Sequence, residues 1–207
     1  DNISLEYSIV PAIIDWIDTN EEITVLLSVT TGENKGAEND YYAELPLPYP
    51  CKNAPLDTVE EVLMVRGLSE ENYYGEKGLE NLVTVFTDGK ININTASAEV
   101  LKSTLQASVS SKEESGVEVE ATEIIDDTAI TAIMDWRIEN PFYNLSSLQE
   151  FFSEEVVGKI SGSGLFDVKS NVFTITSEAR VGKIEKKITA LLERKQPDVK
   201  VKFWKEN

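Results

Sequence analysis

One stretch of this chain, KININTASAEVL at residues 90–101, constrains the fold more than any other. Ile91 and Ile93 alternate with asparagines, as in a short extended segment, and a helical pattern follows at once. Asn94 or Thr95 can cap that helix by accepting a hydrogen bond from a free backbone N–H group. The pattern therefore predicts an extended segment that turns into a helix within a few residues.

Upstream of this stretch, the sequence predicts a helix at residues 5–18 and then a long irregular region. Residues 19–58 contain glycines and prolines that break every longer pattern, so only a short strand is expected, at 25–29. A loop of this length inside a compact domain is usually functional. A second helix is expected from Thr58, ending at Gly67, and a short strand at 82–86.

Downstream, the pattern changes from helices to strands. The acidic segment 108–127 predicts a flexible loop because it combines low hydrophobicity with high charge. Helical patterns follow at 127–138 and from Ser146 or Ser147 onward. Strands are expected at 166–168, 172–181, 183–194 and 199–204, although the third also fits a helix face.

Charge divides the chain of 207 residues, whose net charge is -18. Residues 1–165 hold 9 basic and 31 acidic side chains, whereas residues 166–207 hold 10 and 6. This shift predicts two domains, a helical domain with an acidic loop at 1–165 and a set of strands at 166–207. The negative charge disfavours binding to nucleic-acid phosphates and to anionic membranes.

The composition argues against most enzyme classes. The chain has no histidine, which removes the commonest general base and the histidine-dependent triads. Its single cysteine, Cys51, makes ordinary zinc ligation improbable, and no glycine-rich phosphate-binding loop is present. We therefore expect a protein that is not an enzyme.

The irregular region carries oxygen-bearing side chains that suit a hard cation. Calcium prefers such ligands, but the string lacks the glycine and glutamate positions of an EF-hand loop. A solvated acidic loop is the alternative interpretation. The candidate ligands are Asp18, Asn20, Glu22, Glu38 and Asp40, with Asp15 in reserve.

Five short motifs occur in an order that is specific when they are taken together. They are DWID at 15–18, GAENDYY at 36–42, PY at 48–49, NAPL at 53–56, and EV with RG between 61 and 67, all ahead of ININTAS. In this order and approximate spacing, the chain resembles general secretion pathway protein K, the large minor pseudopilin of type II secretion systems. The last residues, VKFW, also resemble that family's terminal segment.

The resemblance implies an α+β fold, in which a large, mainly helical insert domain joins a small antiparallel pilin-type β-sheet. The insert is expected to be related to sterile-alpha-motif and helix-hairpin-helix folds. It further implies a non-catalytic subunit that caps the pseudopilus tip at the periplasmic face of the inner membrane. The implied partners are minor pseudopilins I and J and, as a further possibility, a secreted substrate; the implied cofactor is structural calcium.

The chain departs from the family pattern at two places. The hydrophobic N-terminal pilin helix is absent, so membrane attachment is expected only through that helix. The segment after Leu105 is unusually acidic. The alternative function is a helix-hairpin-helix module that binds nucleic acid, because the helix after Asn94 and the later segment WRIENPF resemble DNA-uptake receptors. The acidic segment replaces the hairpin that would contact phosphates in such a module.

Overall fold

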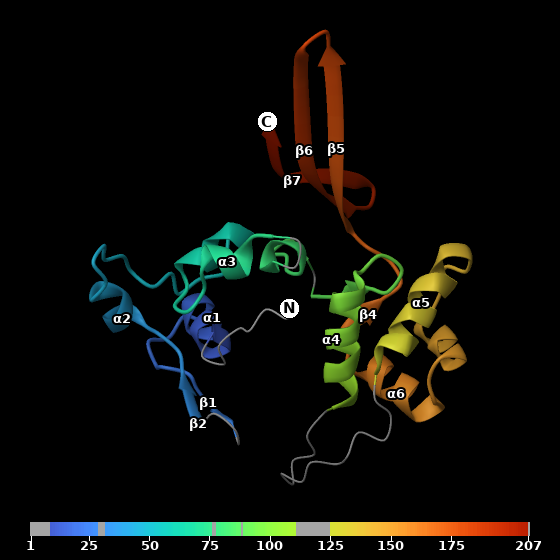
Figure 1. Cartoon of the computed structure of the whole chain (residues 1–207), viewed down its shortest axis with the longest axis horizontal. Coiled ribbons are helices and arrows are strands. Elements are labelled where there is room, and N and C mark those ends of the chain that lie inside the picture. Colours follow the sequence, from blue (N-terminus) through green and yellow to red (C-terminus); the bar gives the residue numbers. More distant parts are fainter. Residues whose placement is uncertain (1–8, 29–31, 76–77, 88, 111–124, 207) are drawn as a thin grey trace. The chain divides into compact units, whose positions relative to one another are not determined.

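The chain folds as two compact units, Asp1–Val85 and Phe86–Asn207. Figure 1 shows the computed structural model, which describes residues 9–28, 32–75, 78–87, 89–110 and 125–206. No helix among these residues is long and apolar enough to cross a bilayer.

The first unit combines short helices with one hairpin. Strands β1 and β2 pair in antiparallel fashion, with Val25 opposite Lys35. The helical segment predicted to end at Gly67 ends earlier, at Met64. Gly67, at a φ of 85°, adopts the left-handed conformation in the turn that follows, where the Leu68 N–H donates to the Val65 carbonyl. The elements are α1 (Ile9–Ile17), β1 (Val25–Ser28), β2 (Gly32–Lys35), α2 (Asn39–Ala43), η1 (Val59–Met64), α3 (Glu70–Tyr73) and η2 (Leu79–Asn81).

Aromatic side chains form much of the core of the first unit. The Trp16 ring meets the Tyr42 ring edge-on, with centroids 5.0 Å apart, and Tyr49 lies 6.2 Å from Trp16. Trp16 and Tyr42 are fully buried, together with Ala12 on the same face of α1. The helical spacing of the apolar residues thus places this face of α1 against α2 and the proline-rich segment.

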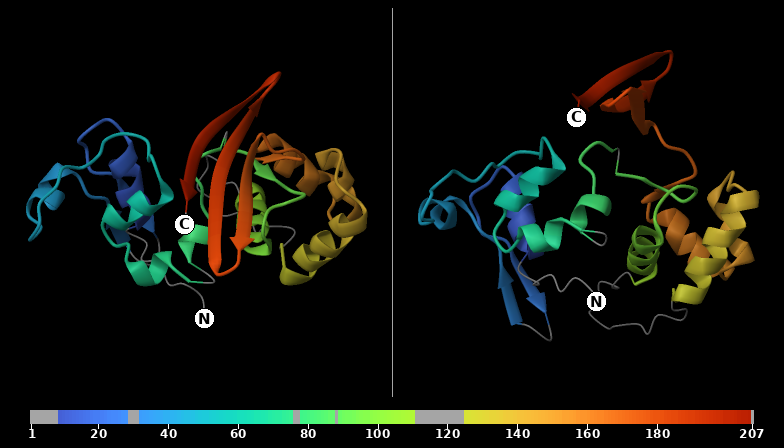
Figure 2. Two further views of the ribbon diagram at one scale, coloured as in Figure 1. Left: turned by 90° about the horizontal axis from the view of Figure 1, so that it is seen from above. Right: turned by 45° about the horizontal axis from the view of Figure 1, so that its top comes forward.

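The second unit contains the longer helices and the three-stranded sheet. β3 pairs in parallel with β4, and the sheet has the order β5-β6-β7 with antiparallel neighbours (Figures 1 and 2). The elements are β3 (Ile91–Asn92), α4 (Ala98–Val109), α5 (Asp127–Glu139), η3 (Leu145–Glu150), α6 (Glu154–Gly162), β4 (Phe166–Asp167), β5 (Val172–Val181), β6 (Ile184–Lys195) and β7 (Asp198–Glu206).

The stretch at 90–101 does turn from a strand into a helix, but neither predicted residue caps it. Ser97 caps α4, because its hydroxyl accepts a hydrogen bond from the Val100 N–H at 3.3 Å. The Asn94 side chain instead donates to the carbonyls of Phe142 and Val168 and accepts from the Phe142 N–H. Asn94 therefore joins three segments that are distant in sequence.

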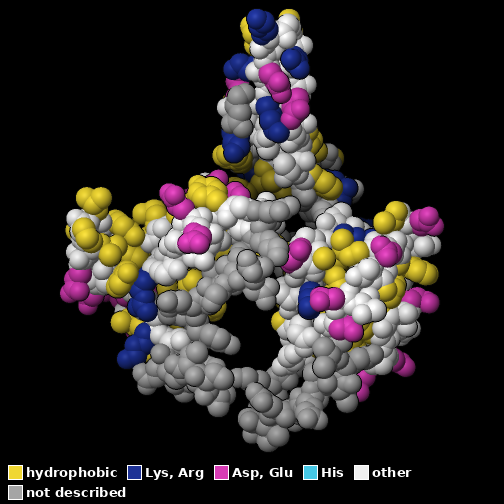
Figure 3. Space-filling model, in the orientation of Figure 1, with side chains coloured by type: hydrophobic (Ala, Val, Ile, Leu, Met, Phe, Trp, Pro, Cys, Tyr) yellow, Lys and Arg dark blue, Asp and Glu magenta, His cyan; other side chains and the backbone are white. Residues whose placement is uncertain are grey.

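The sheet has one apolar face and one mainly polar face. The register places Phe173 opposite Leu192, and Ala190 opposite Trp204, so alternate residues of all three strands share a face. Basic side chains gather on this sheet (Figure 3). The apolar face consists of Phe173, Ile175, Ala179, Val181, Ile184, Ile188, Ala190, Leu192, Val199, Val201 and Trp204, with Ser177, Lys186, Arg194 and Glu206 beside them.

Several sequence predictions are confirmed, including the brief strand near 25–28, the helix from 127, and strand rather than helix at 184–195. Others need correction. The segment 59–64 is a 3-10 helix, and 82–86 is not a strand, because the N–H groups of Leu82 and Val83 both donate to the Leu79 carbonyl and turn the chain. Most of the acidic segment, residues 111–124, lies outside the described residues.

The two compact units do not divide at the predicted boundary after residue 165. β4 begins at Phe166 and pairs with β3, and the Phe166 side chain is buried in the helical core of the second unit. Residues on both sides of position 165 therefore belong to one unit. The predicted helical domain of residues 1–165 is itself split at 85.

Candidate metal centre

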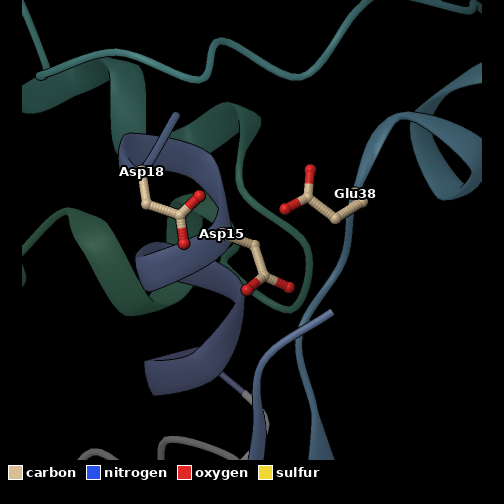
Figure 4. A group of neighbouring side chains, drawn as sticks. All are labelled: Asp15, Asp18 and Glu38. Carbon is tan, nitrogen blue, oxygen red and sulfur yellow. The ribbon is translucent and has the colours of Figure 1, made fainter. Parts of the chain in front are cut away.

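Three carboxylates of the first unit converge on one small space. Asp15, Asp18 and Glu38 each offer an oxygen, and these oxygens all lie within 4.8 Å of one another. Asp15 is fully buried and Glu38 is 4% exposed. Figure 4 shows Asp15 on α1 and Asp18 directly after it, with Glu38 turned toward them from the segment that leads into α2. Like charges this close and this buried repel strongly unless a cation or a proton neutralises them.

Helix geometry places two of the three carboxylates. Asp15 lies in the last turn of α1, and Asp18 directly follows the helix, where its N–H still donates to the Ile14 carbonyl at 2.9 Å, so the two side chains lie on the same side. The last turn of α1 carries no basic residue. Acidic groups at this end of a helix oppose the helix dipole, so the arrangement is unfavourable until a positive charge arrives.

Gly36 leaves the space that the Asp15 carboxylate occupies. A Cβ atom at Gly36 would lie 2.0 Å from Asp15 Oδ2 and 2.6 Å from the Pro11 carbonyl oxygen. The Gly36 N–H donates to the Thr24 carbonyl at 2.8 Å, and the Thr24 N–H donates to Asp15 Oδ1 at 2.9 Å. The β1–β2 hairpin is thus attached to one oxygen of Asp15, while the other oxygen faces the cluster.

Three buried oxygens of this cluster, Asp15 Oδ2, Glu38 Oε1 and Glu38 Oε2, have no hydrogen-bond partner among the residues that the structure describes. Burial raises the pKa of Glu38, and the nearby charges of Asp15, Asp18 and Glu21 raise it further, while the Cys51 thiol beside it lowers it. Buried carboxylate oxygens are normally paired with donors or with a metal. Oxygens that bind a cation need no hydrogen-bond donor from the protein, so these three unpaired oxygens are consistent with a cation site.

Two of the five predicted ligands, Asp18 and Glu38, are members of this cluster. Asn20 lies beside it in a chain of turns: its N–H donates to Asp18 Oδ1 at 3.1 Å, and its Oδ1 accepts from the Glu22 N–H at 2.6 Å. Glu22 and Asp40 are exposed, and neither belongs to the three-carboxylate group. The five-residue ligand set remains a prediction, whereas the geometric centre is Asp15, which the sequence placed only in reserve.

A signal for the central role of Asp15 was present in the sequence. Asp15 is three residues from Ala12 and adjacent to Trp16, so the helical pattern puts it on the buried face of α1. A carboxylate on a buried face requires a partner. The spacing of residues 18, 20 and 22 pointed to a linear loop instead, while the cluster joins α1 to the segment after β2.

The donor set suits calcium. Ca²⁺ takes six to eight oxygen ligands, mixing carboxylates with carbonyls and waters, and tolerates irregular geometry. The three carboxylates supply negatively charged ligands for part of such a coordination shell, and Asn20 has an amide oxygen nearby. Among the described residues, no histidine or second cysteine could favour a softer metal.

Comparison with known proteins agrees with the motif order. Residues 2–88 match the family model described as "Type II secretion system (T2SS), protein K". A search of curated proteins finds no match.

A solved structure shares the fold. It is the GspK-GspI-GspJ complex from enterotoxigenic Escherichia coli, which matches with a TM-score of 0.59 and 22% identity. The match covers 97% of this chain and 62% of the chain in that complex. At this identity the match establishes similarity of fold, and this chain spans less than two thirds of the longer one.

Proposed function

We propose that this chain is a minor pseudopilin of the type II secretion system that caps the pseudopilus tip, because its residues 2–88 match the family model for protein K of that system. In this role it is a non-catalytic subunit, placed at the periplasmic face of the inner membrane. A bulky helical body above a small sheet blocks the addition of further subunits at the tip. The family match favours this role over the nucleic-acid-binding alternative, and so does the net charge of -18.

The apolar face of the β5–β7 sheet is the observation that carries the proposal. Val181 is 78% exposed, Trp204 59% and Ile175 50%. A sheet normally buries its apolar face against another layer, and large exposed apolar patches mark interaction sites. We assign this face to packing within the pseudopilus assembly.

Minor pseudopilins I and J are the proposed partners. The similar solved structure is a complex that contains GspK with GspI and GspJ. A secreted substrate is a further candidate partner. We take the apolar sheet face as the surface used for I and J, since exposed apolar and aromatic side chains are what the buried core of an interface requires.

Neighbouring residues of β5 provide a matched test. Ile175 lies on the apolar face, whereas Thr176 lies on the polar face, and both are exposed. We expect Ile175→Lys to abolish complex formation with purified I and J at micromolar concentration, measured by light scattering. Thr176→Lys should assemble like the unchanged chain. Equal assembly of both variants, or no assembly of the unchanged chain, would contradict the proposal.

We also propose that the first unit binds one structural calcium ion. Asp15, Asp18 and Glu38 would hold it, with Asn20, Glu22 and Asp40 as further predicted ligands. The ion supplies positive charge that links the end of α1 to the segment before α2. The orphaned oxygens of Asp15 and Glu38 support this assignment. Isothermal titration with CaCl₂ tests it, and Asp15→Asn should remove the binding heat.

A further inference from the structure

Arg66 contacts the chain on both sides of Glu38. Its guanidinium donates to the Lys35 carbonyl and to the Gly36 carbonyl, each at 2.9 Å. The same guanidinium lies 5.3 Å from the centre of the Tyr41 ring. One side chain thus contacts residues two and three positions before Glu38 and three positions after it.

The backbone of Arg66 adds a further contact to the same segment. Its N–H donates to the Tyr42 hydroxyl oxygen at 3.2 Å. Tyr42 is fully buried, and burial raises its pKa to about 12, so the hydroxyl stays neutral. The segment from β2 into α2 is therefore attached to residue 66 at its start and at its end.

The Glu38 carboxylate needs such support from its backbone. Its two oxygens are buried, no described residue hydrogen-bonds to them, and they lie close to the carboxylates of Asp15 and Asp18. Repulsion among these groups would turn Glu38 away from α1 if the segment could move. The contacts made by Arg66 oppose that movement before any cation arrives.

We propose that Arg66 is a positioning residue of the cation site, which holds Glu38 toward α1 through its backbone without contacting the ion. The proposal rests on the cation site proposed above. Groups that orient metal ligands typically change metal affinity by roughly 10- to 100-fold when they are removed. Arg66 acts here on the preorganisation of the ligand.

Whether substitution of Arg66 weakens or tightens cation binding distinguishes a positioning role from a purely electrostatic one. A guanidinium near a cation site repels the cation, so a purely electrostatic role predicts tighter binding once the charge is removed. A positioning role predicts weaker binding. Arg66→Met removes both charge and donors, whereas Arg66→Lys keeps the charge and loses the planar fork that reaches two carbonyls.

Arg137 offers a matched control in the second unit. Its guanidinium also donates to two backbone carbonyls, those of Ile93 at 2.9 Å and Ala96 at 2.8 Å. Arg137→Met therefore removes two similar hydrogen bonds from a unit whose described residues form no such carboxylate cluster.

The experiment titrates the whole chain and its variants with CaCl₂ by calorimetry, and with Tb³⁺ by luminescence excited through Trp16. We expect the Kd for Ca²⁺ to rise at least about tenfold for Arg66→Met and less for Arg66→Lys, with no change for Arg137→Met. Near-ultraviolet circular dichroism of the aromatic core shows whether each variant remains folded. If Arg66→Met does not fold, the calcium affinity of Arg66→Lys tests the inference.

The outcomes separate this inference from the cation site itself. If the unchanged chain binds neither Ca²⁺ nor Tb³⁺, the cation site is refuted and the role of Arg66 with it. If the unchanged chain binds but folded Arg66 variants bind equally well or more tightly, the cation site stands and the positioning role is refuted. An equal loss in Arg137→Met would show a general effect of stability and would also overturn the inference.

Discussion

The two units of this protein treat buried polar groups in opposite ways. In the second unit, Asn94 has its amide donor and its acceptor satisfied, and Arg137 donates to two carbonyls. In the first unit, three buried oxygens of Asp15 and Glu38 have no partner in the part of the chain that the structure describes. A buried polar network stabilises a fold only when its members are satisfied. These polar groups of the second unit are thus paired within the unit, whereas the carboxylates of the first unit form the cation site that we propose.

The apolar core of the second unit is larger than that of the first. Aliphatic and phenylalanine side chains from α4, α5, η3 and α6 fill the second unit, with Leu101, Leu105, Ile133 and Ile160 fully buried. The first unit has a smaller core around Trp16 and Tyr42. A smaller core contributes less to the free energy of unfolding, so binding of an ion has greater weight there.

Of the changes considered, Gly36→Ala should destabilise the first unit the most relative to the second. The new Cβ would overlap Asp15 Oδ2 and approach the Pro11 carbonyl, so α1 and the hairpin must separate. We expect loss of calcium binding by calorimetry and a loss of stability of about 3 kcal/mol, typical of severe overpacking. Gly158→Ala is the control, because a Cβ there meets nothing within 4 Å. Unchanged binding in Gly36→Ala would show that the close approach at Gly36 is not required.

Removal of calcium should weaken the first unit alone. A ligand at a concentration 100 times its Kd stabilises the unit that binds it by about 2.7 kcal/mol. Amide hydrogen exchange with and without a chelator would measure this, and protection should fall in α1 and α2 while α4 and α5 keep theirs. A uniform loss of protection, or none, would show that the two units do not differ in this way.

Asn94→Ala should destabilise the second unit and leave the first unit unchanged. It removes hydrogen bonds to Phe142 and Val168 and leaves backbone groups without partners, which costs about 2 kcal/mol. The denaturation midpoint of the second unit should fall whether or not calcium is present. Asn144→Ala is a milder control, since its bonds are exposed. A calcium-dependent effect of Asn94→Ala would contradict the independence of the two polar networks.

A fall in pH should have the smallest effect on the stability of the first unit. Burial, Asp15, Asp18 and Glu21 raise the pKa of Glu38, so the folded first unit binds a proton more readily than the unfolded chain does. Between pH 7 and the ordinary pKa of 4.5, lowering the pH should therefore stabilise the calcium-free first unit. Over the same interval, calcium affinity should fall because the proton competes for Glu38.

Thermal melts at several pH values, with and without calcium, would measure both trends, and Glu38→Gln is the control. If the calcium-free chain loses stability from pH 7 to 5 as much as Glu38→Gln does, Glu38 is not the titrating group.

Local patterns predicted much of the fold. The spacing of apolar residues identified α1 and α5, and alternation identified β5 and β7. The choice of strand for β6 was correct because Gly182, at a φ of 63°, forms a tight turn that pairs β6 with β5. Such features depend on neighbours in sequence, which a reader of the sequence can see.

Long-range contacts account for the misses. Asn94 was expected to cap a helix, but its amide is taken by residues 48 and 74 positions away. The predicted boundary after residue 165 followed the change in charge, whereas the pairing of β3 with β4 joins the two sides. No local pattern contains that information.

The sequence alone determined the acidic character and the helices and strands whose periodicity is local, and the order of its motifs predicted the resemblance to protein K. Only the tertiary structure decided that Asp15 is the centre of the carboxylate cluster, that Gly36 makes room for it, and that Arg66 holds both sides of Glu38. The physical reason is that periodicity reports which face of an element is buried. Which groups meet there depends on how distant segments pack.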